Sequence, residues 1–132
     1  MVVVVLYMED KMATKDRVRE DDMEGTAFLG VMGNTPTNRV LDFLVVYDQF
    51  DYSITDIAKS AKVGYATLMR IWKNLEKNKI IKMSRVVGKA KMYKINKENP
   101  VVQHFIKMYW EITNKATERS LLHQKVPALA RT

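Results

Sequence analysis

The chain has 132 residues, of which 47% are apolar; this supports one compact domain and argues against two independent cores. It contains no cysteine, which excludes disulfides, thiolate metal sites and cysteine nucleophiles and suits an intracellular protein. The net charge is +7, and the apolar run at residues 1–8 is too short to span a membrane and lacks the features of a signal peptide. We therefore expect a cytoplasmic protein with no membrane-spanning segment.

Residues 1–33 carry a net charge of −3 and show little apolar periodicity. Within them, residues 2–7 have strong β propensity, which predicts a strand that joins a sheet edge or pairs with a second copy of itself. Residues 9–24 are charged and are expected to be mobile. The chain is accordingly divided into an N-terminal extension (1–33), a central domain (34–99) and a C-terminal helical segment (100–132).

The central domain is predicted to begin with two helices. Thr35 is a suitable N-cap and Pro36 a suitable first helical residue, so a helix is expected from residue 36 to about residue 48. Ser53 is a second N-cap candidate, and the apolar residues after it follow a three- and four-residue step, which predicts a helix over 54–61.

A third helix is expected over residues 65–77, after a turn too short for any other structure. In this turn Gly64 is expected to take a positive φ and Val63 to enter the core. Asn78 is expected to end the helix in the left-handed conformation. The residues of this helix that are predicted to be buried are Leu68, Ile71, Trp72 and Leu75.

Two β-rich segments, 80–87 and 91–95, flank the turn Gly88-Lys89-Ala90 and predict a hairpin. Alternation places four of their side chains on the core: Ile81, Met83, Tyr93 and Ile95. Asn99 and Pro100 then begin a long helix, which is expected to run to about Ser120 and to be followed by a loose tail.

The positive charge is concentrated on the third helix and the hairpin. Residues 59–97 contain twelve basic side chains and one acid, Glu76, a local net charge of +11. Such a surface attracts a phosphate backbone, although a solvated lysine-rich surface kept for solubility is the alternative. The order of elements predicts a mainly α fold with a small β-hairpin: a winged helix-turn-helix with a long C-terminal helix.

On that geometry the third helix enters the major groove of double-stranded DNA and the hairpin lies along the backbone or the minor groove. Arg70 is the candidate for bidentate contact with guanine. The candidates for base contact are Tyr65, Ala66, Thr67, Met69 and Arg70. The candidates for backbone and wing contact are Lys62, Lys73, Lys77, Arg85, Lys89 and Lys91.

Five stretches together resemble a known family: Leu29-Gly30, then residues 34–44, 53–58, 67–76 and 87–96. The resemblance is to archaeal winged-helix transcriptional regulators, distantly similar to the multiple-antibiotic-resistance regulator class, and it covers roughly residues 29–112. It implies DNA binding through the third helix and the wing, and a dimer built on terminal helices. Two positions depart from the family pattern, because Gly64 replaces a common capping serine and Asn78 a common glycine.

The last helix offers apolar residues for a homodimer interface: Phe105, Tyr109, Trp110 and Ile112. Three of them, all but Trp110, also suit ordinary core packing or an effector pocket, and the sequence does not identify an effector. Trp72 is expected in the core and not as a platform for bases.

The sequence shows no nucleophile–base pair, phosphate-binding glycine loop or metal-ligand cluster, so we expect no enzyme, no metal and no cofactor. The alternative to a DNA-binding regulator is a winged-helix interaction module in a replication, transcription or conjugation assembly, with only loose DNA affinity.

Overall fold

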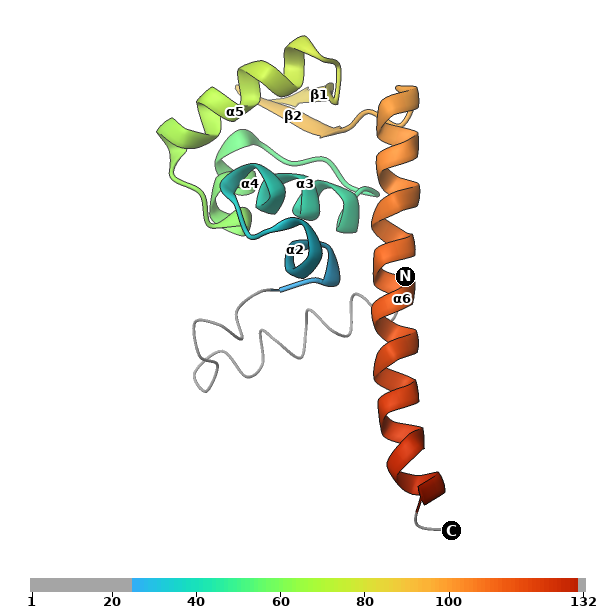
Figure 1. The fold of residues 1–132 in the computed structure, drawn as a ribbon. Helices are drawn as coiled ribbons and strands as arrows, with labels where there is room; N and C mark the ends of the chain where they lie inside the picture. Colours follow the sequence, from blue (N-terminus) through green and yellow to red (C-terminus); the bar gives the residue numbers. More distant parts are fainter. Residues whose placement is uncertain (1–24, 131–132) are drawn as a thin grey trace.

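The computed structural model describes residues 25–130, with side chains described as far as Leu122. Its elements, in chain order, are α2 (Ala27–Met32), α3 (Pro36–Val46), α4 (Ile54–Ala61), α5 (Tyr65–Lys77), β1 (Ile81–Val87), β2 (Ala90–Ile95) and α6 (Pro100–Ala130) (Figure 1). This arrangement confirms the predicted fold class. The strand expected at residues 2–7 and the acidic segment that follows lie outside the described residues.

The caps predicted for α3 and α4 are present. The Thr35 hydroxyl accepts a hydrogen bond of 3.2 Å from the backbone N–H of Asn38, and the Ser53 hydroxyl accepts one of 3.2 Å from that of Asp56. Each hydroxyl satisfies an N–H that has no partner within its helix. These caps explain why both helices begin where the sequence predicts, whereas α3 ends at Val46, two residues earlier than expected.

The positive φ angles expected at Gly64 and Asn78 fall elsewhere. Gly64 has φ −62° and Asn78 has φ −90°, whereas Lys62 (φ 56°) and Lys79 (φ 57°) adopt the left-handed conformation. At both helix ends the residue after the left-handed one donates back five positions, Val63 to the Ala58 carbonyl and Ile80 to the Leu75 carbonyl, at 2.9 Å each. This Schellman geometry fixes which residue must be left-handed, whatever its type.

A short helix, α2, lies in a segment that the sequence assigned to the N-terminal extension. Phe28 and Leu29 on α2 are buried in the main core, and Phe28 packs edge-on against Phe105 of α6 at a centroid distance of 5.4 Å. The prediction missed this helix because six residues are too few to show helical periodicity. Residues 26–32 are therefore part of the folded body, while the wider domain division stays a prediction.

The hairpin pairs β1 with β2 in antiparallel register, from Ile81 opposite Ile95 to Val87 opposite Ala90. An extra residue, Ser84, bulges from β1 between Met83 and Arg85. A backbone bridge joins Tyr52 to Tyr93, so β2 is flanked on both sides and β1 is the outer strand. Of the four side chains predicted to face the core, Ile81, Tyr93 and Ile95 are buried, whereas Met83, on the outer strand directly before the bulge, is exposed.

The last helix, α6, is 31 residues long, about 46 Å, and continues ten residues beyond the predicted end at Ser120. Pro127 therefore lies within the helix and not in a loose tail. Val102 and Tyr109 are buried in the core shared with α3, and the C-terminal part of α6 extends past the rest of the body (Figure 1). No helix among residues 25–130 combines the length and hydrophobicity that crossing a membrane requires.

Candidate nucleic-acid interface

The two faces of α5 differ sharply. Leu68, Trp72 and Leu75 are buried, as predicted, and Ile71 is half-buried. On the other side Ala66, Arg70, Lys73 and Lys77 are exposed and follow one another at steps of three or four residues. We call this exposed row the α5 stripe.

The predicted base-contact residues differ in how far their side chains are exposed to solvent. Tyr65 is 58% exposed at the start of α5, whereas Thr67 and Met69 are half-buried. Thr67 and Arg70 line an open groove between α5 and the start of α3, with Pro36 and Thr37 on its opposite side. Arg70 belongs to both the groove and the α5 stripe, which leaves its guanidinium accessible from outside.

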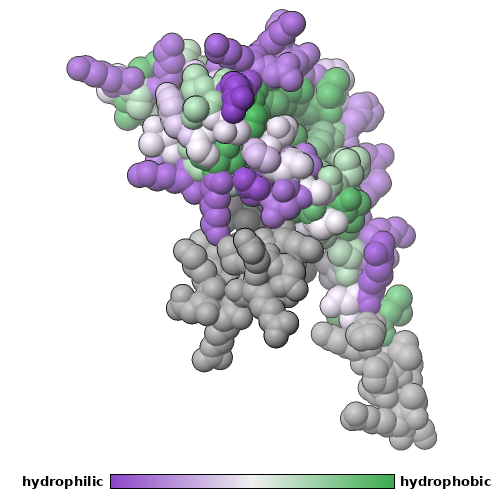
Figure 2. All heavy atoms as spheres, turned by 60° about the vertical axis from the view of Figure 1, so that its left-hand side comes forward, coloured by the Kyte–Doolittle hydropathy of each residue, from purple (hydrophilic) through white to green (hydrophobic). Residues whose placement is uncertain are grey.

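The hairpin tip carries two further cations. Gly88 takes φ 61° in the tip, and Lys89 and Lys91 on either side of Ala90 are exposed. The hairpin lies beside α5 because Trp72 packs edge-on against Tyr93 at a centroid distance of 5.0 Å. Figure 2 shows hydrophilic side chains gathered, with apolar patches between them, over the end of the molecule that carries these elements.

Arg85 is not a free cation. Its guanidinium donates to both oxygens of the Asp51 carboxylate, at 2.8 Å to Oδ2 and 3.1 Å to Oδ1. The guanidinium, followed by the Ser84 hydroxyl that donates to the same carboxylate, lowers the pKa of Asp51 to about 2. The prediction of Arg85 as a wing contact overlooked this partner, which lies 34 positions earlier in the chain.

Two more of the basic side chains in residues 59–97 are also paired. Lys97 lies 2.8 Å from a carboxylate oxygen of Asp48, and Lys82 lies 3.4 Å from one of Glu98. All three acidic partners lie outside residues 59–97, so a charge count along the sequence overstates the charge of the surface. The other nine basic side chains make no ion pair with the described residues.

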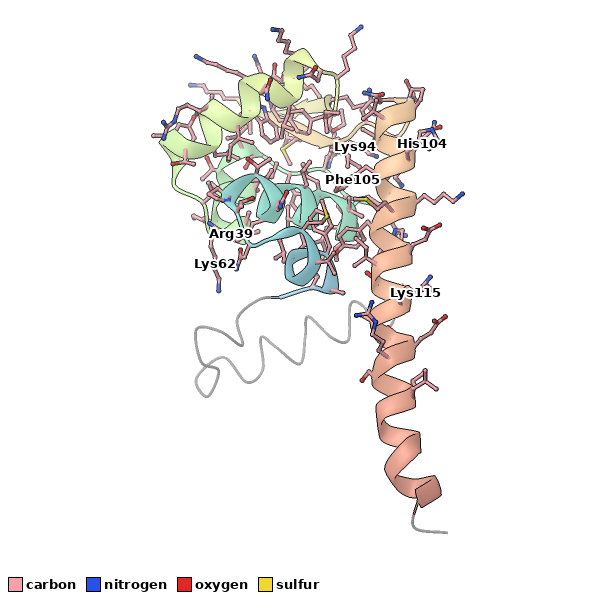
Figure 3. All side chains as sticks on the ribbon, viewed as in Figure 1. Arg39, Lys62, Lys94, His104, Phe105 and Lys115 are labelled. Atoms are coloured by element: carbon pink, nitrogen blue, oxygen red, sulfur yellow. The ribbon has the colours of Figure 1, made fainter. Side chains whose placement is uncertain are left out.

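Lys62 lies at the end of α4, where Arg39 holds its backbone. Arg39 donates through Nε to the Ala61 carbonyl at 3.0 Å and through Nη2 to the Lys62 carbonyl at 3.3 Å. Figure 3 shows the two side chains near each other on this part of the molecule. Arg39 is a residue that the sequence reasoning missed, because no spacing rule links positions 22 apart.

The four dimer candidates differ in burial. Tyr109 is fully buried against Phe28 and Asp42 of its own chain, so its prediction as an interface residue is wrong. Phe105, Trp110 and Ile112 are half-buried, and Trp110 packs edge-on against Tyr109 at a centroid distance of 4.9 Å. Other large apolar side chains of α2 and α6 are more exposed: Val31, Met32, Leu121 and Leu122.

The described residues contain no group of three or more His, Asp or Glu side chains arranged to hold a metal ion. Trp72 lies in the core, as predicted. The site offers exposed cations and hydrogen-bond donors on α5 and the hairpin tip, which suit the binding of an anionic partner.

No family model matches the chain, and no curated protein sequence matches it. Solved structures do. MepR, a transcription regulator of the Staphylococcus aureus multidrug efflux pump MepA, is 19% identical with a TM-score of 0.53, over 74% of this chain and 75% of its own. A MarR-family transcriptional regulator from Silicibacter pomeroyi is 16% identical with a TM-score of 0.50, over 78% of this chain and 70% of its own. The chain therefore has the winged-helix fold of these regulators.

Proposed function

We propose that this chain is a sequence-specific, double-stranded DNA-binding transcriptional regulator. The observation that carries the proposal is the α5 stripe, whose cations have no acidic partner among the described residues and lie beside a hairpin with a basic tip. The winged-helix fold shared with MepR and the Silicibacter pomeroyi regulator supports the same function. The resemblance seen in the sequence included an archaeal origin, whereas these two proteins are bacterial, so that origin stays a prediction.

In the proposed complex α5 enters the major groove. An α-helix with its side chains is about 10–12 Å across, which matches a groove about 12 Å wide, and the 13 residues of α5 extend over about 20 Å. Arg70, near the middle of α5, reads a guanine, while Lys73 and Lys77 hold phosphates. Gly64 has no side chain with which to cap α5, so the first N–H groups of the helix remain available to a phosphate.

The wing contacts in this proposal reduce to the hairpin tip. Lys89 and Lys91 contact the backbone or the minor groove, and Arg85 is left out because Asp51 binds it. Lys62, the first residue of the turn between α4 and α5, remains a candidate for contact with the DNA backbone. Each neutralised phosphate contributes about −0.9 to the slope of log K against log salt.

We also propose a homodimer through the terminal helices. Val31, Met32, Leu121 and Leu122 are exposed on α2 and α6, and burying such side chains between two copies is favourable. A twofold dimer predicts two half-sites in the target, separated by about one helical turn of DNA or a multiple of it.

Selection of duplexes from a random pool, followed by sequencing, tests the function and yields the target. With the selected duplex, Arg70→Ala is expected to cost about 1–3 kcal/mol and to relax the preference at one base pair. Lys89→Ala is expected to weaken selected and random duplexes alike and to reduce the salt slope by about 1. Lys115→Ala removes the same charge from α6, far from the hairpin (Figure 3), and serves as the matched control. Equal losses on both duplexes for Arg70→Ala would refute base reading.

A second function is favoured by the exposed apolar side chains on α2 and α6. They also suit a winged-helix interaction module that docks on another protein and binds DNA only loosely. No enrichment of any duplex from the pool, together with recovery of a stable protein partner, would support this function over the first.

A further inference from the structure

The loop between α3 and α4 holds the hairpin by two adjacent residues. Asp51 binds the outer strand β1 through the Arg85 guanidinium and the Ser84 hydroxyl. Tyr52 binds the inner strand β2 through two backbone hydrogen bonds with Tyr93, of 2.9 and 2.8 Å. Each strand of the hairpin is thus fixed to the same short loop.

This loop is itself part of the rigid helix-turn-helix. Ser53, directly after Tyr52, caps α4. In turn, α4 contacts α5, and Val63 in the turn between the two helices is buried in the core. The direction of the hairpin relative to α5 therefore depends on the contacts made by Asp51 and Tyr52, in addition to the packing of Trp72 on Tyr93. Tyr52 acts through its backbone, so Asp51 is the residue of the pair whose side chain can be tested.

The β-bulge explains how Asp51 reaches two neighbours on one strand. In a regular strand Ser84 and Arg85 would point to opposite faces, but the extra residue breaks the alternation between Met83 and Arg85. Both side chains then meet one carboxylate. The contact lies between the core end of the hairpin and the tip, where Val86 faces Lys91 and Val87 faces Ala90.

Two arrangements of Arg85 compete. The side chain is 65% exposed, so it is physically able to leave Asp51 for a phosphate. Leaving would abandon two charge-assisted hydrogen bonds and would leave an ionised carboxylate, only 13% exposed, close to a phosphate backbone. Both effects oppose the exchange, which favours Arg85 remaining on Asp51.

We propose that Asp51 is a positioning residue for the wing: by holding Arg85 and Ser84 it directs Lys89 and Lys91 toward DNA bound by α5, and Arg85 contacts no phosphate. This inference rests on the proposed function. It assigns Asp51 and Arg85 a joint role in DNA binding that neither would have alone.

The test compares Asp51→Asn with Asp48→Asn. Both remove one negative charge, both carboxylates are 13% exposed, and both bind a cation at 2.8 Å, but the partner of Asp48 is Lys97, beyond the hairpin. The first readout is hydrogen exchange of backbone amides 84–92 in the free protein. Exchange is expected to rise in Asp51→Asn and in Arg85→Ala and to stay unchanged in Asp48→Asn. Unchanged exchange in Asp51→Asn overturns the proposal, whether or not the protein binds DNA.

The second readout is affinity for the selected duplex at several salt concentrations. Relative to Asp48→Asn, Asp51→Asn is expected to bind about three- to tenfold more weakly, because the wing must then be ordered on binding. Arg85→Ala is expected to lose a similar factor with an unchanged salt slope, and the double variant no more than either single one. If Arg85 contacted phosphate, Asp51→Asn would bind more tightly than Asp48→Asn, and Arg85→Ala would lower the slope by about 0.9.

A charge-swapped pair, Asp51→Arg with Arg85→Asp, separates positioning from direct contact. The swap restores an ion pair between loop and strand, so exchange protection and part of the affinity are expected to return relative to either single variant. Protection that stays lost in the swap counts against the proposal. The two proposals can also fail separately. If amides 84–92 of the wild-type protein are protected from exchange but the protein binds no duplex even in dilute buffer, the proposed function is refuted, and with it the role of Asp51 in directing the wing toward DNA. The conclusion that Asp51 holds Arg85 and Ser84 would still stand.

Discussion

The phenol of Tyr109 on α6 donates a hydrogen bond of 2.7 Å to Oδ1 of Asp42, a buried carboxylate on α3. The Thr26 hydroxyl, at the start of α2, donates to the same oxygen. Burial raises the pKa of Asp42, and the two hydrogen bonds lower it by a smaller amount. One buried group therefore links α2, α3 and α6, and holds the long helix against the winged-helix body.

We predict that Tyr109→Phe lowers the free energy of unfolding by about 1–3 kcal/mol. The change keeps the buried ring but removes a hydrogen bond to a buried carboxyl group. Urea denaturation measures the loss. Tyr47→Phe is the matched control, because the Tyr47 ring is half-buried and its hydroxyl makes no hydrogen bond with the described side chains. A loss for Tyr109→Phe no larger than for Tyr47→Phe would show that the Asp42 contact adds no stability.

Stability should also depend on pH through Asp42. Its folded pKa is raised above the ordinary value of 3.8, so the folded state holds this proton more tightly than the unfolded state. The stability that Asp42 contributes is thus fully present below pH 3.8 and is lost as the pH rises through the folded pKa. In urea denaturation, the stability of wild type minus that of Asp42→Asn should fall over this range. A difference that increases with pH would contradict the sign.

Asp51 is expected to act with the opposite sign. Its folded pKa is lowered to about 2, so its contribution is present above pH 3.8 and is lost as the pH falls toward 2. The stability of wild type minus that of Asp51→Asn should therefore fall on acidification. Asp48→Asn gives the matched comparison, and a difference for Asp51→Asn that is independent of pH between 2 and 4 would mean that the Arg85 contact does not persist in solution.

The local elements of the fold were readable from the sequence because their signals are local. The bounds of α4 and α5 follow from a capping serine, an apolar stripe and a short turn, all within a few residues of one another. Asp42 on α3 is buried, which no local signal in the sequence predicted. Its partner Tyr109 lies 67 positions away, and no pattern in the sequence links the two.

The candidate interface also combines features that the sequence could predict with features that it could not. The exposure of Arg70, Lys73 and Lys77 follows from helical periodicity on α5, so it could be predicted. The ion pair between Arg85 and Asp51 could not be predicted, because it depends on a bulge in β1 and a loop before α4 that meet only in the folded chain. Charge counted along a sequence identifies a basic surface, but it does not identify which cations are already paired.

The left-handed lysines give a further prediction on stability. Lys62 has φ 56°, a conformation that costs a residue with a Cβ atom roughly 1 kcal/mol and costs glycine little. Lys62→Gly is therefore expected to raise the free energy of unfolding by about 0.5–1 kcal/mol. Part of this gain is offset because glycine also increases the conformational entropy of the unfolded chain. Lys59→Gly, in the last turn of α4, should instead lower it by about 1 kcal/mol. If both changes destabilise equally, the turn conformation at Lys62 is not strained.

Trp72 gives the last prediction, because its indole Nε1 is buried without a hydrogen-bond partner among the described residues. Trp72→Ala is expected to cost about 3–5 kcal/mol, as for other large core side chains. Trp72→Phe should cost much less, since phenylalanine keeps most of the apolar contact and removes a polar group whose burial costs about 1–3 kcal/mol. Far-UV circular dichroism should follow the urea denaturation, because the substitution changes tryptophan fluorescence itself. A cost for Trp72→Phe close to that for Trp72→Ala would show that Nε1 has a stabilising partner. The Tyr93 ring, packed at 87° to the indole, would then be the group to test, with Tyr93→Leu.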